Sequence, residues 1–207
     1  MKNILEKYNV SRETYDKLIT FQNTVLKWND KINLISKTSA ENIWNRHIID
    51  SLQLIKFIES KDLVLYDFGS GAGFPAIVLA IAGKQFFPNL KITLIESIGK
   101  KAMFLNEVKN ILNLDINILQ NRIEKTNLPK ANIITSRALA SLDKLLYYAE
   151  PFCDKNTKLI FPKGEKWQEE LKTAQQKWRF EYTSFSSETN KNSCILIIKN
   201  IRRNKNG

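Results

Sequence analysis

The chain has 207 residues, of which 43% are hydrophobic and 26% are charged, so it can fill one well-packed domain with an extension. Its formal net charge of +11 favours a polyanionic partner such as nucleic acid, although a lysine-rich surface without a ligand is the alternative. Cys153 and Cys194 are far apart and lie in no C-x-x-C motif, so we expect reduced thiols and no metal site. No segment resembles a signal peptide or a membrane span, which favours a cytoplasmic protein.

Residues 1–60 are predicted to form a helical N-terminal extension. Ser11 is a suitable N-cap, and apolar residues at helical spacing predict an amphipathic helix over about 12 to 30. Ser39 is expected to begin a second helix, and the stretch 50–58 keeps the same period. Their apolar stripes must pack on another surface.

A strand, a glycine loop and a helix are predicted in succession between Leu63 and Ile81. The apolar run 63–66 has the length of a strand buried on both faces, and Pro75 suits the first turn of a helix. Because Phe74 occupies the sixth position, the loop reads G-x-G-x-G and departs from the G-x-G-x-x-G of dinucleotide-binding folds. The loop glycines are Gly69, Gly71 and Gly73.

Asp67 stands directly before this loop. Backbone N–H groups of such a loop face a ligand, but a neighbouring carboxylate disfavours a pyrophosphate. The same charge favours a cationic ligand such as S-adenosylmethionine. The alternative is that the glycines serve only close packing of the helix on the strand.

From residue 91 onward, predicted strands and helices alternate, which indicates a doubly wound parallel α/β sheet within residues 61–207. Two β-rich runs close the chain with a short polar segment between them, so we expect them to pair antiparallel. The tail 202–205 is expected to be unstructured. The strands after the glycine loop are predicted at 91–96, 116–119, 132–136, 158–162, 178–185 and 193–201.

Polar residues at the predicted strand ends are candidates for ligand contacts, because ligands of doubly wound sheets lie outside the carboxyl ends of the strands. Glu96 could accept hydrogen bonds from the ribose hydroxyls of a nucleoside, or it could be a solvated acid. Ile123 and Glu124 follow the third strand, where either an adenine or a plain polar turn would lie. Arg137 could hold a carboxylate or a phosphate, or it could form a structural ion pair.

His47 is the only histidine, which excludes the common histidine-based metal sites and catalytic triads. With Arg46 and Asp50 on the same helix it is expected to form a hydrogen-bonded cluster, for which a structural and a catalytic role both remain open.

Together these motifs resemble the ribosomal RNA small subunit methyltransferase G family, also called glucose-inhibited division protein B. The resemblance covers about residues 20 to 165; Ala76 and Ser36 stand where the family commonly has Gly and Thr. It rests on Lys27-Trp28-Asn29, Arg46-His47, the run 67–75, Glu96-Ser97, Gly99-Lys100-Lys101, Arg122 with Glu124, Ser136-Arg137-Ala138 and Lys163-Gly164.

The resemblance implies a class I methyltransferase that moves a methyl group from S-adenosylmethionine to N7 of one guanine in 16S ribosomal RNA. N7 has a lone pair and no proton to remove, so no general base is required and no catalytic residue is assigned. The expected partner is 16S ribosomal RNA or the small ribosomal subunit, and the protein is expected to be a monomer without metal. The family's cofactor contacts fall on Gly69, Phe74, Ile123, Glu124 and Arg137, with Glu96 as the ribose ligand.

One basic face is predicted around the mouth of the cofactor site. Two other functions remain open: a nicotinamide-dependent oxidoreductase, which the glycine spacing and Asp67 disfavour, and a non-catalytic RNA-binding module, which leaves the glycine loop without a role. The residues of the predicted basic face are Lys100, Lys101, Arg137, Lys163, Arg202 and Arg203.

Overall fold

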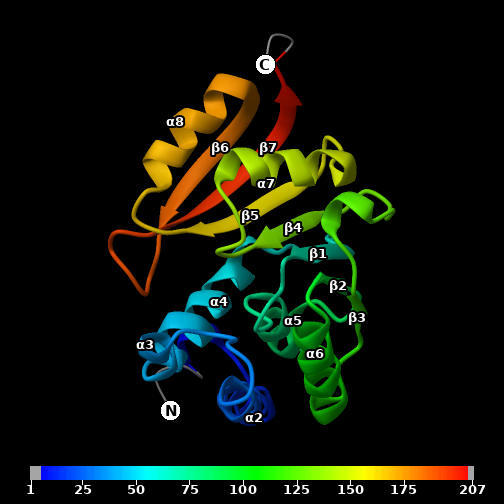
Figure 1. The fold of residues 1–207 in the computed structure, drawn as a ribbon, viewed down its shortest axis with the longest axis vertical. Coiled ribbons are helices and arrows are strands. Elements are labelled where there is room, and N and C mark those ends of the chain that lie inside the picture. The colour runs from blue at the N-terminus through cyan, green and yellow to red at the C-terminus, as the bar shows by residue number, and fades with distance from the viewer. Residues whose placement is uncertain (1–5, 205–207) are drawn as a thin grey trace.

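The computed structural model describes residues 6–204 and is built around one seven-stranded sheet (Figure 1). The strand order is β3-β2-β1-β4-β5-β7-β6; strands β1 to β5 pair in parallel, and β7 runs antiparallel to β5 and β6. The predicted doubly wound sheet with an antiparallel C-terminal pair is therefore confirmed. The strands are β1 (Val64–Phe68), β2 (Lys91–Ile95), β3 (Ile116–Leu119), β4 (Ile133–Ser136), β5 (Lys158–Lys163), β6 (Trp178–Ser186) and β7 (Cys194–Arg203).

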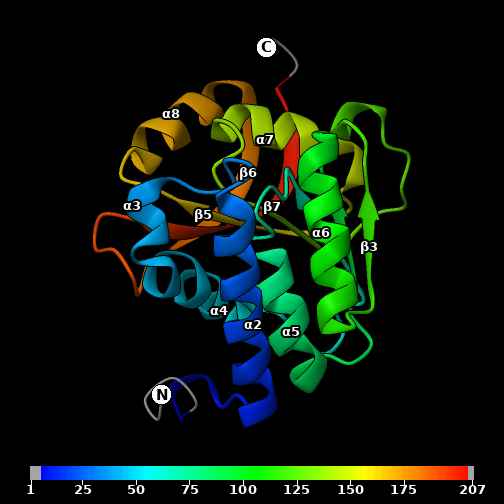
Figure 2. The ribbon, with the colours of Figure 1, turned by 60° about the horizontal axis from the view of Figure 1, so that its bottom comes forward.

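Helices cover both faces of the sheet. In Figure 1, α7 and α8 lie above the sheet, whereas α5, α6 and the N-terminal helices lie below it. Figure 2 shows α2 running beside α5 and α6. No described helix combines the length and the apolar character that crossing a membrane requires. The main helices are α2 (Arg12–Asn29), α3 (Lys37–Ala40), α4 (Asp50–Leu52), α5 (Ala76–Phe86), α6 (Gly99–Leu112), α7 (Leu142–Ala149) and α8 (Trp167–Lys177). The shorter turns are the π-helix η1 (Trp44–Ile49) and the 3-10 helices η2 (Gln53–Phe57), η3 (Ile123–Lys125) and η4 (Glu150–Phe152).

The N-terminal extension shares a hydrophobic core with one face of the sheet. Leu18 and Phe21 of α2 are fully buried in the same cluster as Leu65 of β1 and Ile77 of α5. The predicted helix over 12–30 is confirmed, and the Ser11 side chain caps it by accepting a hydrogen bond from the Thr14 N–H.

The second helix begins earlier than predicted. Ser36 is its N-cap and accepts a hydrogen bond from the Ser39 N–H, so Ser39 lies inside the first turn instead of at the cap. The following helical turns run without a break from Trp44 to Phe57 as η1, α4 and η2.

Asp67 lies within β1, which continues to Phe68 beyond the predicted end of the strand. The backbone of Asp67 is paired with Leu94 of β2 on one side and Thr135 of β4 on the other. Because β1 is a central strand paired with β2 and β4 up to Phe68, the Asp67 side chain is buried inside the protein.

The tail is partly a strand, contrary to the sequence-based expectation. Arg202 and Arg203 belong to β7 and pair with Arg179 and Trp178 of β6, whereas Lys205 lies outside the described residues. Cross-strand pairing orders this segment although its own sequence has no strong strand pattern.

Candidate functional site

The loop between β1 and α5 bends through three glycines with positive φ: +64° at Gly69, +53° at Gly71 and +84° at Gly73. A Cβ atom on Gly73 would lie 2.6 Å from Ile77, so this glycine permits close packing of the helix. A Cβ atom on Gly71 would meet only the Gly69 carbonyl oxygen, at 3.7 Å, so the chain leaves space there. The packing interpretation therefore accounts for Gly73, whereas Gly71 faces space that a ligand can use.

Glu96 follows β2 and holds the glycine loop. One carboxylate oxygen accepts a hydrogen bond from the Gly71 N–H at 2.8 Å, and the other accepts one from the Ile98 N–H at 2.7 Å. The side chain is buried, which contradicts the alternative of a solvated strand-end acid. Each carboxylate oxygen can accept a second hydrogen bond, so a ligand hydroxyl can still bind there.

Asp67 is a buried carboxylate with only one oxygen satisfied. Oδ1 accepts a hydrogen bond from Thr135 Oγ1 at 2.6 Å, whereas Oδ2 has no partner among the described residues. Burial raises the pKa of Asp67 from 3.8 to about 7, against the lowering by hydrogen bonds and by Arg137. A cationic group beside Oδ2 would restore the charged form, which fits a ligand carrying an ammonium or a sulfonium.

The predicted adenine-side residues follow β3, the next strand outward from β2. Ile123 is buried in the hydrophobic core, and Glu124 is exposed in the short 3-10 turn η3. The two residues therefore lie at the same edge of the sheet as Glu96 and the glycine loop.

The Phe74 side chain packs against the N-terminal extension. Its ring stacks on His47 with centroids 4.8 Å apart and lies 5.0 Å from the ring of Phe21. Arg137 also lies over the Phe74 ring, at 5.4 Å from its centroid. The Phe74 side chain thereby connects the glycine loop to the N-terminal extension.

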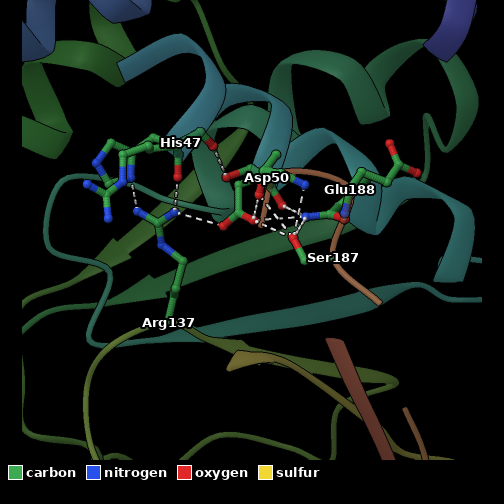
Figure 3. A network of polar contacts seen from close by, with 9 residues as sticks. His47, Asp50, Arg137, Ser187 and Glu188 are labelled. Carbon is green, nitrogen blue, oxygen red and sulfur yellow. Dashed lines mark hydrogen bonds and ion pairs between the residues drawn. The ribbon is translucent and has the colours of Figure 1, made fainter. Parts of the chain in front are cut away.

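Arg137 is engaged by the N-terminal extension (Figure 3). Its Nη1 donates hydrogen bonds to Asp50 Oδ2 at 3.1 Å and to the Arg46 carbonyl oxygen at 3.0 Å. Its Nη2 lies against His47 Nδ1. The predicted cluster around His47 therefore exists, but Arg137 takes the place expected for the Arg46 side chain.

Asp50 is the centre of this network and also binds the turn between β6 and β7. Its Oδ1 accepts hydrogen bonds from Gln53 Nε2 at 2.9 Å and from Thr189 Oγ1 at 2.8 Å, with Ser187 Oγ at 3.5 Å. One carboxylate thus ties together the extension, the segment after β4 and the β6–β7 turn, as Figure 3 shows.

A large cavity lies beyond Arg137, at the carboxyl ends of β4 and β5, and has a volume of about 1410 Å³. The N-terminal extension, the start of α8 and the β6–β7 turn form its walls. Leu139 lines it, and the same side chain lies 2.6 Å from the Cβ position of Gly69. The cavity and the glycine loop are therefore neighbours, separated by Leu139.

The predicted basic face is wrong in three of its members. Lys163 is buried, and its ammonium binds Glu170 at 2.7 Å and the Ala140 carbonyl oxygen at 3.1 Å. Because β7 is antiparallel, Arg202 and Arg203 lie at the edge of the sheet opposite the glycine loop. Lys100 is exposed and Lys101 half-buried in the first turn of α6.

Several residues that line the cavity are not among the site residues predicted from the sequence. Leu139 and Ala138, which has a φ of +55°, follow β4 and shape the wall of the cavity. Lys166 and Lys191 line it from two other segments. For Ala138 the sequence offered two signals, its position after a strand and its place in the Ser136-Arg137-Ala138 motif. The other contacts depend on segments that are distant in sequence. Among residues 6–204, no cluster of three or more His, Cys, Asp or Glu is arranged to hold a metal.

The chain matches known proteins over most of its length. A family model described as rRNA small subunit methyltransferase G matches residues 14–195. Proteins named ribosomal RNA small subunit methyltransferase G from Orientia tsutsugamushi (strain Ikeda) and Ruegeria sp. (strain TM1040) are 42% and 38% identical to the chain. These alignments cover 93% of the chain and 93% of the Orientia protein, and 94% of the chain and 95% of the Ruegeria protein.

Solved structures agree with the fold. TYW2 of M. jannaschii, crystallised in complex with AdoMet, superposes with a TM-score of 0.54 over 82% of this chain and 78% of its own, at 15% identity. At that identity the similarity supports the class I methyltransferase fold alone. The sequence comparisons decide the family: the chain belongs to the rRNA small subunit methyltransferase G family.

Proposed function

We propose that the protein transfers a methyl group from S-adenosylmethionine to N7 of one guanine in 16S ribosomal RNA. The observation that carries the cofactor assignment is the buried Asp67 carboxylate, whose Oδ2 has no partner among the described residues and lies beside the glycine loop. A dinucleotide pyrophosphate would be repelled there, whereas the cationic end of S-adenosylmethionine would be attracted.

The residues at the carboxyl ends of β1, β2 and β3 would hold the cofactor. The open space at Gly71 accommodates its methionine part, and Glu96 accepts hydrogen bonds from the ribose hydroxyls while it keeps the loop in place. Gly69, Gly73 and the backbone of Phe74 complete the loop. Ile123 and Glu124 would flank the adenine, and Arg137 would lie next to the reacting groups.

When bound, S-adenosylmethionine supplies a methyl group on a sulfonium, which is an electrophile without further activation. The protein therefore has to position the guanine and exclude water, because N7 offers a lone pair and needs no base. Alignment of two reactants can lower a barrier by roughly 7–11 kcal/mol. Arg137, which is hydrogen-bonded to Asp50, and Leu139 line the large cavity on the side of the glycine loop.

The setting follows from the same assignment. We propose that the protein acts in the cytoplasm as a monomer on 16S ribosomal RNA or the small ribosomal subunit. We assign residues 1–60 to the N-terminal extension and residues 61–207 to the methyltransferase domain. Lys100 is exposed and Lys101 half-buried in the first turn of α6, where they can meet RNA phosphates.

The test is methyl transfer from labelled S-adenosylmethionine to small ribosomal subunits isolated from a strain that lacks the enzyme. Labelling of one guanine at N7, mapped on the RNA, is the expected result. Stabilisation against heat by NAD but not by S-adenosylmethionine would overturn the assignment in favour of an oxidoreductase. RNA binding without any transfer would leave only a binding module.

A further inference from the structure

The large cavity beside the glycine loop carries more positive charge than its lining suggests at first sight. Three of its acidic residues are already paired: Asp50 with Arg137, Asp143 with Lys177, and Glu170 with Lys163. These pairs cancel, so they leave the cavity without a local excess of negative charge.

Three exposed cations remain around the cavity without an ionic partner in the described part of the chain. Arg46 belongs to η1, Lys166 precedes α8, and Lys191 lies in the β6–β7 turn. Glu169 is the one exposed carboxylate of the lining that has no cationic partner among residues 6–204. The cations therefore come from three separate walls and outnumber the free carboxylates.

Amide side chains add hydrogen-bonding capacity to two opposite walls. Asn42 and Asn45 are exposed on the extension, and their side chains make no hydrogen bond with the rest of residues 6–204. Asn190 and Asn192 line the cavity from the β6–β7 turn. An amide offers both a donor and an acceptor, which suits the edge of a nucleobase.

The size and the position of the cavity suit a nucleotide. Its volume of about 1410 Å³ exceeds the roughly 300–1,000 Å³ of ordinary small-molecule sites, which leaves room for flanking phosphates. Leu139 separates it from the glycine loop, so a base inside the cavity would lie next to a cofactor held by the loop.

We propose that this cavity receives the acceptor nucleotide of the RNA, with its neighbouring phosphates bound by Arg46, Lys166 and Lys191 and its base contacted by Asn42 and Asn45. The inference rests on the proposed function and adds RNA contacts in the cavity to those proposed for Lys100 and Lys101. A base splayed out of its stack is the form in which an enzyme of this kind can reach N7, and a concave site that opens to solvent beside the glycine loop can receive such a base.

The experiment compares two triple variants that lose the same charge. The cavity variant is Arg46→Gln, Lys166→Gln, Lys191→Gln; the control is Arg179→Gln, Lys199→Gln, Arg202→Gln, whose exposed cations lie on β6 and β7, away from the cavity. The dissociation constant for protein-free 16S ribosomal RNA is measured from about 50 to 200 mM salt. Circular dichroism and the affinity for S-adenosylmethionine verify that both variants fold.

The cavity variant should bind RNA at least tenfold more weakly at low salt, and its salt slope should fall by about 2, since each phosphate contact on single strands contributes about 0.7. The control should keep a slope close to wild type. Equal losses in both variants would mean that only net charge matters, and an unchanged cavity variant would place the phosphates elsewhere; either result overturns the proposal. Binding to intact small subunits is measured in parallel; if the cavity variant loses this binding but keeps wild-type affinity for protein-free RNA, the cavity binds an acidic protein and the proposal is overturned.

A second arm tests the base contacts. Asn42→Ala with Asn45→Ala should lower kcat/KM for methyl transfer about tenfold, the effect of one ordinary hydrogen bond, and leave the salt slope unchanged. An unaltered kcat/KM would remove the amides from the proposal. The RNA-binding readout requires no catalysis, so a failure of wild-type methyl transfer would refute the proposed function separately.

Discussion

Arg137 donates a hydrogen bond to Asp50 at 3.1 Å across 87 positions of the chain. This ion pair joins the segment after β4 to the helices that precede the sheet. The same Asp50 carboxylate holds Thr189 of the β6–β7 turn, so one side chain fixes two walls of the cavity. Removing it should loosen the cavity as well as the fold.

Asp50→Ala should lower the free energy of unfolding by roughly 3 kcal/mol, because it leaves the largely buried Arg137 guanidinium without its carboxylate. Urea unfolding followed by circular dichroism measures this. The control is Glu13→Ala, which breaks the exposed pair with Lys17 on α2 and should leave the unfolding midpoint almost unchanged. Equal midpoints for both variants would show that the Asp50 network contributes little to stability.

Asp67 should make the stability of the cofactor-free protein depend on pH. Its pKa is raised from 3.8 to about 7 in the folded state, so between these values the folded protein keeps a proton that the unfolded chain releases. The stability from this group is complete below pH 3.8 and is lost as pH rises to about 7, by at most roughly 4 kcal/mol. Asp67→Asn should lose this dependence, measured by urea unfolding at several pH values. Parallel curves for both proteins would contradict the raised pKa.

Binding of S-adenosylmethionine should depend on the same carboxylate with the opposite sign. The ionised form attracts the cationic ligand, so affinity should rise as pH rises through about 7. Asp67→Asn should bind more weakly and show a flatter pH profile by isothermal calorimetry. A wild-type affinity that is constant from pH 5 to pH 8 would exclude Asp67 as a partner of the ligand's cation.

Gly71→Val should lose measurable affinity for S-adenosylmethionine while the far-ultraviolet circular dichroism stays native. The added side chain would enter space that the chain leaves open, and its φ of +53° costs a branched residue about 1–2 kcal/mol. Gly164→Ala is the matched control, since its Cβ atom would meet nothing within 4 Å. Unchanged affinity of Gly71→Val would place the cofactor elsewhere.

Glu96→Ala should weaken the binding of S-adenosylmethionine by roughly 1–3 kcal/mol, because charged hydrogen bonds to the ligand and to the Gly71 N–H are lost. Glu96→Gln keeps an acceptor and should lose less. Calorimetric titration of both variants measures the difference. If Glu96→Ala binds as tightly as wild type, the carboxylate serves only the loop.

Replacing Lys100 and Lys101 with Ala should reduce the salt slope of RNA binding by about 1.4 if both side chains contact phosphates. Affinity for S-adenosylmethionine should stay nearly the same. Filter binding of 16S ribosomal RNA over a salt series is the measurement. A slope equal to that of wild type would mean that these lysines are ordinary solvated surface.

The local sequence determined the secondary-structure elements and their order along the chain. The strand, the three glycines and the proline that lead into α5 encode their conformation within a few residues, because positive φ and helix entry are local properties. Alternation of strands and helices determined the sheet, and their positions at strand ends made Asp67 and Glu96 candidate site residues.

Only the tertiary structure decided which charges are free. Lys163 forms an ion pair with Glu170, and Arg137 forms one with Asp50 of the N-terminal extension. Because β7 is antiparallel, Arg202 lies at the edge of the sheet opposite the glycine loop. Pairing of this kind depends on distances between segments that are remote in sequence, and a charge pattern along the chain contains no such distances. The cavity was invisible for the same reason, since its walls meet only after the extension and the β6–β7 turn have packed around the sheet.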